Sequence, residues 1–342
     1  MSQATRSRRH AEAHRFPPGR ISPTIDNRLS PAWRSRPLSS TPFPEAPEGL
    51  RHVGPAGHQS PADVLAALRL PEQGRVFSLA LPRYTGMPLF GSHPPFQVTM
   101  YRTPAGLRGD GVEPWGPHNE VNLQYMAENV SGTAHSGAHV DALAHMTIGE
   151  DDHWYGGGNA QEHLGDRGPT VGDGSRLPPF IRRGVLLDVP GYLGVDALPS
   201  HQPVDAAQLQ AVARHQGVTV RRGDVVLVRT GYLSAWPDTD RMARHTTAGP
   251  DLSAARWLLE QGVVATGSDT ETYEVQPAPD PGSPANPQPV HTLLLIEHGI
   301  YLFEGIYLEE LAAEHVHEFL FVALPLKIKG TTGSMLDPVA II

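Results

Sequence analysis

The chain contains no cysteine in its 342 residues. This absence excludes disulfide bonds, thiolate nucleophiles and cysteine-ligated zinc, so any metal site must use nitrogen and oxygen ligands. No apolar run approaches the ~20 residues that a membrane-spanning helix needs. The sequence also lacks the Gly-x-Ser-x-Gly elbow, the phosphate-binding P-loop, the dinucleotide-binding Gly-x-Gly-x-x-Gly and the His-Glu-x-x-His motif. Several common hydrolase and nucleotide-binding classes are thereby excluded.

The overall composition is acidic and rich in loop-forming residues. The formal net charge is −9, and the chain holds 35 glycines and 34 prolines. An acidic chain is a poor ligand for nucleic acid or for an anionic membrane surface. We therefore expect a small-molecule substrate, no nucleic-acid or membrane partner, and a cytoplasmic location.

The first part of the chain differs in composition from the rest. Residues 1–44 hold eight arginines and two acidic residues, with many serines and prolines and no hydrophobic periodicity. The apolar core of a secretory signal is missing from this stretch. We predict a disordered tail over residues 1–60 and one folded domain over 61–342. The alternative for the tail is an arginine-mediated contact with nucleic acid or a partner.

Buried strands alternate with helices through the folded part. Short apolar runs bounded by turn residues predict strands, and periodic stretches that begin at Asp or Ser and end at Gly predict helices. The predicted strands are 76–81, 98–101, 121–130, 185–189, 224–230, 263–266, 300–303 and 318–326. The predicted helices are 61–70, 206–216, 254–261, 290–298 and 308–314. This order predicts an α/β domain.

A cluster of histidines is the most informative feature of the sequence. Three histidines and one aspartate, namely His135, His139, Asp141 and His145, lie within eleven positions. Imidazole and carboxylate are ligands that suit zinc, manganese and iron. A histidine-rich surface turn is the alternative interpretation, because the chain has 18 histidines in all.

No single regular element can bring this cluster onto one metal ion. In a strand, His135 and Asp141 would lie roughly 20 Å apart, and in a helix they would not share a face. A strand end at His135, a bend at Gly137 and a helix starting near Asp141 would bring them together. We expect His135, His139 and Asp141 to be direct ligands and His145 to lie just behind them, as a proton shuttle.

A second candidate pair of ligands lies near the end of the chain. A helix over 290–298 that ends at Gly299 would advance roughly 12 Å, and the following strand would return roughly 16 Å. His291 and Glu304 would then lie side by side, as ligands of one metal site must. A helix-end histidine and a solvated glutamate are the alternatives.

These motifs resemble the cyclase family of metal-dependent hydrolases, which includes kynurenine formamidase and isatin hydrolase. The family pattern His-x-Gly-Thr-His-x-Asp-x-x-x-His matches residues 135–145, with Ala138 in place of the threonine. The resemblance implies that His291 and Glu304 bind a second metal together with a bridging Asp141. It also implies a single domain of the swivelling β/β/α type, one or two zinc or manganese ions, and a homodimer or homotetramer.

Three further residues are candidates for substrate binding. The resemblance implies that the loop over 86–96 lines the substrate site, which points to Phe90 and His93. Trp154, in a glycine-rich loop, could stack on an aromatic substrate. Packing in the protein core is the alternative for Phe90 and Trp154.

The expected activity is hydrolysis of an amide C–N bond, in a cyclic amide or an aryl formamide, by a metal-bound hydroxide. A lactone hydrolase or a cyclase of secondary metabolism would use similar chemistry. A catalytically degenerate metal-binding family member is the non-enzymatic alternative, supported by Ala138.

Overall fold

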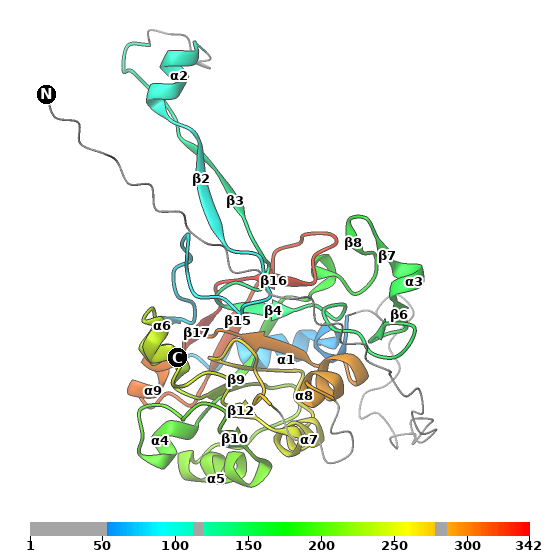
Figure 1. Ribbon diagram of the computed structural model, residues 1–342. Helices are drawn as coiled ribbons and strands as arrows, with labels where there is room; N and C mark the ends of the chain where they lie inside the picture. Colours follow the sequence, from blue (N-terminus) through cyan, green and yellow to red (C-terminus); the bar gives the residue numbers. More distant parts are fainter. Residues whose placement is uncertain (1–52, 112–118, 278–285) are drawn as a thin grey trace, which may run out of the picture. The chain divides into compact units, whose positions relative to one another are not determined.

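A computed structural model describes residues 53–111, 119–277 and 286–342 (Figure 1). The described residues all belong to one compact unit, Pro42–Ile342. Most of the predicted tail, residues 1–52, lies outside the described part. From Val53 onward the chain packs on the domain, because Ala56 is buried and the Tyr301 hydroxyl donates a 3.0 Å hydrogen bond to the Val53 carbonyl. The folded domain therefore begins by Val53 rather than at residue 61.

The helices are short, and the longest two are those with the strongest sequence signals. The α-helices are α1 Pro61–Ala67, α2 Pro104–Asp110, α3 Ala160–His163, α4 Val189–Leu193, α5 Ala206–Gln216, α6 Thr239–Met242, α7 Leu252–Gln261, α8 Pro289–His291 and α9 Glu309–Ala313. Three short 3₁₀-helices are η3 Pro55–His58, η4 Gly174–Arg176 and η5 Tyr232–Ala235. A π-helix is η6 Thr292–Glu297.

The boundaries of α5 and α7 follow from their end residues. Asp205 and Asp251 accept hydrogen bonds from the first free amides of the two helices. Gly217 and Gly262 end them in the left-handed conformation, with φ of 70° and 76°. A side chain with a Cβ would be strained there. The predictions for these two helices are confirmed.

A nine-stranded mixed sheet forms the centre of the domain, in the order β1-β17-β15-β9-β11-β13-β14-β4-β16. Its strands are β1 Val76–Ser78, β4 His139–Asp141, β9 Phe180–Asp188, β11 Val225–Arg229, β13 Ala265–Ser268, β14 Tyr301–Glu304, β15 Glu318–Ala323, β16 Gly333–Met335 and β17 Val339–Ile341. The four central strands β9, β11, β13 and β14 run parallel, and the remaining pairs are antiparallel.

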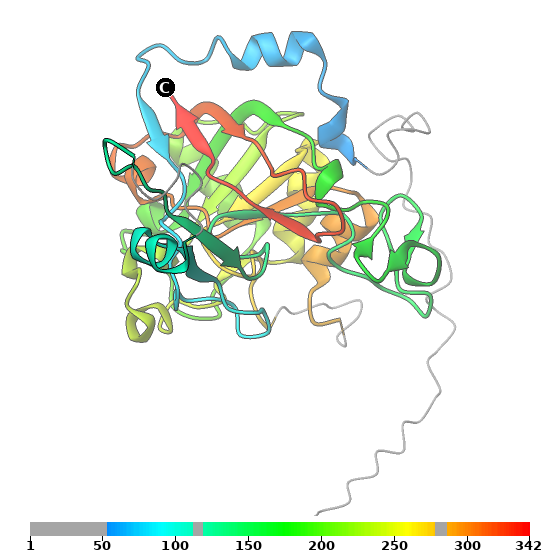
Figure 2. The same cartoon turned by 90° about the horizontal axis from the view of Figure 1, so that it is seen from above.

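Helices cover the parallel strands, which explains why β11, β13 and β14 are buried along their whole length. Figure 1 shows α4, α5 and α7 together along one side of the sheet. Figure 2 shows the red C-terminal strands crossing the green and yellow strands at an angle, so the sheet is curled. The mixed α/β fold agrees with the class predicted from the sequence.

Two-stranded sheets lie outside the main sheet, and they are β2–β3, β5–β6, β7–β8 and β10–β12. Their strands are β2 Gln97–Arg102, β3 Ala127–Ser131, β5 His153–Trp154, β6 Gly158–Asn159, β7 Leu164–Gly165, β8 Gly168–Pro169, β10 Pro203–Val204 and β12 Gly249–Pro250. The strand predicted over 121–130 is shorter than expected. Its partner β2 ends at Arg102 because Thr103 begins α2, so residues before Ala127 have no strand to pair with.

Within the described residues, no helix has both the length and the apolar character needed to cross a bilayer.

Aromatic rings fill the centre of the core. Phe180 meets Phe303 at 4.9 Å between ring centroids, and Phe303 meets Phe321 at 5.3 Å, both edge to face. Each of these rings is fully buried. This cluster packs β9, β14 and β15 together, and β14 also carries Glu304.

Replacing Phe321 with alanine is expected to lower the free energy of unfolding by about 3–5 kcal/mol, because a buried ring is lost and a cavity remains. Urea denaturation followed by circular dichroism would measure the change. Leu324→Ala is the matched control, since Leu324 lies just beyond the same strand and is 62% exposed. Equal stability losses in the two variants would contradict this assignment of the core.

Candidate metal centre

The segment from β3 to β4 folds differently from the prediction, although the bend is where we expected it. Gly137 has φ of 58° and allows the sharp turn. His135 lies in the loop after β3 rather than at a strand end. Asp141 does not begin a helix: it is the last residue of strand β4, and a turn closed by a 2.9 Å bond from the His145 amide to the Ala142 carbonyl follows.

Neighbouring strands explain why residues 139–141 are extended. β4 lies between β14 and β16, which supply hydrogen-bonding partners on both sides. Because side chains alternate along a strand, His139 and Asp141 project from the same face. The pairing with β14 places Glu304 opposite His139. Two predicted ligands that are far apart in the sequence thus become direct neighbours.

The pairing of β4 with β16 also makes room for His135. Gly333 lies opposite Asp141 in this register. A Cβ atom on Gly333 would lie 2.6 Å from Cε1 of His135. Only glycine fits at this point without displacing the imidazole.

The second predicted motif forms a short α-helix followed by a π-helix, α8 and η6, instead of one regular helix. Gly299 ends this stretch with φ of 64°, as predicted, and β14 follows. His291 lies at the end of α8 and is fully enclosed. Its position depends on Glu274, which accepts hydrogen bonds from the Val290 amide at 3.0 Å, the His291 amide at 2.9 Å and His291 Nδ1 at 2.6 Å.

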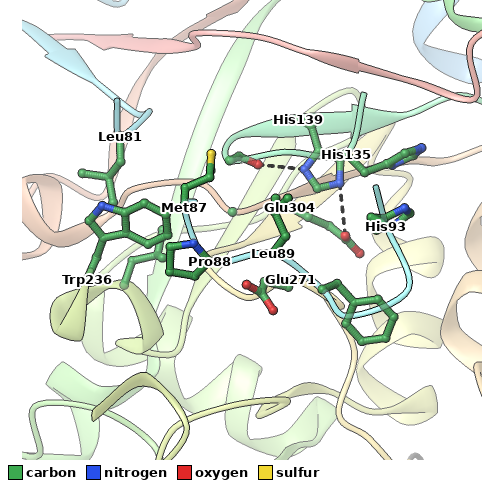
Figure 3. A pocket seen from close by; sticks show the side chains of 14 residues that line it. Leu81, Met87, Pro88, Leu89, His93, His135, His139, Trp236, Glu271 and Glu304 are labelled. Carbon is green, nitrogen blue, oxygen red and sulfur yellow. Dashed lines mark hydrogen bonds and ion pairs between the residues drawn. The ribbon is translucent and has the colours of Figure 1, made fainter. Parts of the chain in front are cut away.

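All five predicted metal ligands converge around Asp141. His135 Nδ1 lies 2.9 Å from Asp141 Oδ1, and His139 Nε2 lies 3.8 Å from the same oxygen. His291 Nε2 is 3.7 Å from Asp141 Oδ2 and 3.4 Å from Glu304 Oε1. Glu304 Oε2 is 3.3 Å from His139 Nε2, a pair drawn with a dashed line in Figure 3. The sequence predicted these five residues, but it did not predict the register of the strands that carry them or the extent of their burial.

Two overlapping groups have ligand atoms within 4.8 Å of one another in the described residues. The first is His135, Asp141 and His145, and the second is His139, Asp141 and Glu304. Asp141 belongs to both groups. His145 Nε2 lies 4.0 Å from Asp141 Oδ1, so His145 is close enough to be a ligand itself.

Several ligand atoms in this cluster are buried without a hydrogen-bond partner. They are His135 Nδ1, His139 Nε2 and both carboxylate oxygens of Asp141. The 2.9 Å approach of His135 to Asp141 lacks hydrogen-bond geometry, so the two atoms are close without being paired. Buried polar atoms are normally satisfied. Nitrogen and oxygen atoms that face one another unpaired in this way fit a bound divalent cation.

The electrostatics of the cluster favour a cation. Burial alone would raise the pKa of Asp141, but the neighbouring imidazoles His145, His135 and His291 bring it well below the ordinary value. Burial opposes a charge on His291, whereas Asp141, Glu274 and Glu304 raise its pKa well above the usual range. Carboxylates and imidazoles thus interact strongly in a buried site, and this donor set fits a bound divalent cation.

Contacts behind the ligands orient the imidazole rings. His139 Nδ1 donates to the Gly137 carbonyl at 2.8 Å, which turns Nε2 toward Glu304 and Asp141. His135 Nε2 lies 3.0 Å from Thr332 Oγ1. Such contacts select the tautomer and direction of a ligand histidine. Because a backbone carbonyl orients His139, this contact does not require a hydroxyl at Ala138.

Glu274 and Thr332 contact the candidate ligands but were not predicted from the sequence. No local signal connects Glu274 with His291, or Thr332 with His135. Asp269, which directly follows β13, is bound to the end of β11 instead of to the cluster. It accepts hydrogen bonds from the Thr230 and Gly231 amides at 2.8 and 2.7 Å.

A small pocket, partly open to solvent, adjoins the cluster. His135, His139 and Glu304 form one side of it, and its other walls are mostly apolar (Figure 3). Phe90 and His93 line the cavity, where the resemblance had placed them. The His93 ring stacks on His135 with 5.0 Å between centroids.

Trp154 is not brought to the cavity. Its side chain is only 3% exposed and packs tightly over Gly158 and Gly172. A Cβ on Gly158 would lie 2.1 Å from the indole nitrogen. The glycines of this loop therefore accommodate the indole in the protein interior, in agreement with the packing alternative.

Glu274→Gln is expected to weaken metal binding about 10- to 100-fold, because the partner that directs His291 loses its charge. Competition against a chromogenic chelator would measure the affinity for zinc and manganese. Glu260→Gln removes one exposed carboxylate elsewhere and is expected to bind metal normally. An unchanged affinity in Glu274→Gln would argue against His291 as a ligand.

Comparisons with known proteins agree with this geometry. A family model with the description "Putative cyclase" matches residues 77–275, more than half of the chain. A crystal structure described as a novel cyclase has 27% identity and a TM-score of 0.73, covering 85% of this chain and 96% of that chain. A search of curated proteins found no significant match.

More distant solved structures share the fold. Isatin hydrolase A from Labrenzia aggregata, bound to benzyl benzoate, has 22% identity and a TM-score of 0.56, covering 78% of this chain and 93% of that chain. An isatin hydrolase bound to the product analogue thioisatinate has 19% identity and a TM-score of 0.57, covering 83% and 99%. The family match over more than half of the chain, which includes the His-x-Gly-x-His-x-Asp segment at residues 135–141, shows that the chain belongs to the cyclase family.

Proposed function

We propose that this protein is a metal-dependent hydrolase that cleaves an amide C–N bond in a cyclic amide or an aryl formamide. The observation that carries the proposal is the set of buried, unpartnered ligand atoms around Asp141 beside an apolar cavity. The fold shared with isatin hydrolases supports the reaction class. His135, His139, Asp141, His291 and Glu304 would hold the metal, zinc or manganese, as one ion or two.

When bound, such a cation lowers the pKa of a water molecule toward neutrality and supplies the nucleophile for carbonyl attack. The chain's own residues do the rest. The apolar walls around Phe90 limit the access of bulk water, which strengthens the electrostatic interactions inside the cavity. Phe90 and His93 would position the acyl or aryl part of the substrate beside the ligand cluster.

His145 is the residue we assign to proton transfer. Burial, opposed by Asp141, lowers its pKa to about 4, so the imidazole is neutral near pH 7 and can accept a proton. The ring stacks on His135 with 4.0 Å between centroids and remains partly exposed. It would take a proton from the nucleophile and deliver it to the departing nitrogen.

Three finer properties belong to the same proposal. We expect the architecture to be of the swivelling β/β/α type, with a homodimer or homotetramer as the assembly. We also propose a cytoplasmic location. Size measurement by light scattering would test the assembly directly.

Metal analysis is the first test of the proposed function. Protein purified without added metal, chelator or affinity tag is expected to contain about one or two equivalents of zinc or manganese. Removal with a chelator should abolish amide hydrolysis, and adding the metal back should restore it. Protein that binds neither ion would contradict the hydrolase mechanism and indicate a degenerate family member.

A substrate panel then distinguishes the reaction types. Aryl formamides and cyclic amides are expected to be hydrolysed faster than matched lactones, with release of product followed by absorbance. Faster turnover of the lactones would assign the protein to ester rather than amide chemistry.

His145→Ala is expected to retain its metal and to lose at least 100-fold in kcat, since general acid–base catalysis typically contributes about 10²–10⁴-fold. Elemental analysis and steady-state kinetics would be done on the same preparation. His153→Ala, which changes a partly exposed histidine paired with Asp151, is the control. Loss of metal in His145→Ala would make His145 a ligand, and near-normal turnover would remove it from the mechanism.

A further inference from the structure

A second acidic side chain lies in the cavity beside the candidate metal centre. Glu271 lines the cavity together with Glu304, as Figure 3 shows. In the described residues it belongs to neither group of side chains whose ligand atoms lie within 4.8 Å of one another. The proposed metal site and proton transfer leave this carboxylate without a role.

The backbone around Glu271 is firmly held. Glu271 follows β13 in the same loop that carries Glu274, the partner of His291. Asp269 ties the start of this loop to the end of β11, through hydrogen bonds from the Thr230 amide and hydroxyl, both at 2.8 Å. The loop is therefore braced at both ends, and Glu271 lies between the two attachment points.

The carboxylate itself is also held in place. The hydroxyl of Tyr232, a residue only 5% exposed, donates a hydrogen bond to it. Tyr232 is the first residue of η5, and its side chain belongs to a small buried cluster with Leu233 and Met242. A side chain fixed in this way is directed into the cavity with little conformational freedom left to lose on binding.

The positive neighbour of this carboxylate among the described residues is the histidine His139, whose charge lowers the pKa of Glu271. Among the described residues that line the cavity there is no lysine or arginine. The walls nearby are apolar, with Leu89, Leu233 and Trp236 among them. Burial raises the pKa of Glu271, and the hydrogen bond from Tyr232 opposes that rise. One neutral donor uses only part of the capacity of a carboxylate to accept hydrogen bonds.

A carboxylate that is largely removed from water and has no lysine or arginine beside it in the cavity wall is costly to maintain. The cost is offset if a ligand supplies the missing positive charge. An ammonium group would form a charge-assisted hydrogen bond with Glu271. The indole of Trp236 in the same cavity is compatible with a cationic ligand as well.

We propose that Glu271 binds a protonated amine of the substrate, which makes the preferred substrate a cationic amide with an apolar body between the amine and the scissile carbonyl. This inference rests on the proposed amide hydrolysis for the identity of the reacting group. The carbonyl would face the ligand cluster, the apolar body would contact the walls near Leu89, and the amine would reach Glu271. Specificity then arises from a charge that lies away from the reacting bond.

The test uses phenylformamides that differ only in the para substituent: aminomethyl, hydroxymethyl or ethyl. The first is a cation and a donor, the second a neutral donor, and the third neither. We expect kcat/KM at pH 7.5 to be about tenfold or more higher for the aminomethyl than for the ethyl compound. In Glu271→Gln, which keeps the size and the contact with Tyr232, this ratio should fall close to one.

Two further variants complete the kinetic test. Glu128→Gln removes an exposed carboxylate of β3 and should keep the wild-type ratio. Tyr232→Phe keeps the charge of Glu271 but releases the carboxylate, so the ratio should fall only about threefold. An unchanged ratio of kcat/KM between the aminomethyl and ethyl compounds in Glu271→Gln overturns the proposal. If Glu271→Gln does not fold, an unchanged ratio in Tyr232→Phe overturns it. Loss of bound metal in Glu271→Gln would make Glu271 a ligand and would overturn it too.

A binding measurement separates this proposal from the proposed function. Para-substituted phenylacetic acids with the same three groups contain no scissile amide. Titration calorimetry on the metal-containing protein gives their Kd values. About tenfold tighter binding of the aminomethyl compound, lost in Glu271→Gln, would support the amine subsite even if no formamide were hydrolysed. Hydrolysis of all three formamides without any preference would support the proposed function and refute the subsite.

Discussion

The burial of the Asp141 carboxylate is the constraint on which the rest of the site depends. This side chain has no exposed surface, and its two oxygens face four histidines without a hydrogen bond to any described residue. Removing a carboxylate from water costs several kcal/mol unless opposite charge compensates for it. Imidazoles alone compensate only when protonated. A divalent cation shared through Asp141 would satisfy both oxygens and the surrounding nitrogen lone pairs.

The curled sheet supplies the rigidity that such a site requires. β4 presents His139 and Asp141 from one face, β14 places Glu304 opposite His139, and β16 leaves room for His135 by means of Gly333. Register on a paired strand is specified to within one residue, because a slip would turn every side chain to the other face. Ligands on strands are therefore positioned more accurately than ligands on free loops.

The loop after β13 connects the ligand cluster with the cavity. Glu274 orients His291 from behind, and Glu271, three residues earlier, faces the space where a substrate would bind. Both positions depend on the attachment of Asp269 to the end of β11. One segment thus contributes to the geometry of the metal centre and to the chemistry of the pocket wall.

Local signals in the sequence determined the elements whose ends they mark. Asp205 and Gly217 delimit α5 because capping groups act within one turn of the helix. The spacing of His135, His139 and Asp141, with a glycine between them, likewise indicated a bent ligand segment. The pairing of His291 with Glu304 followed from the lengths of two adjacent elements.

Tertiary structure decided everything that depends on contacts between distant segments. Asp141 ends a strand rather than starting a helix, because β14 and β16 provide hydrogen bonds that a local reading cannot anticipate. Thr332 reaches His135 across 197 positions, and Glu274 reaches His291 across 17. The burial of Trp154 and the position of Glu271 in the cavity wall likewise depend on contacts between distant segments. Sequence patterns report the interactions of neighbours along the chain, whereas packing decides which side chains from distant segments meet.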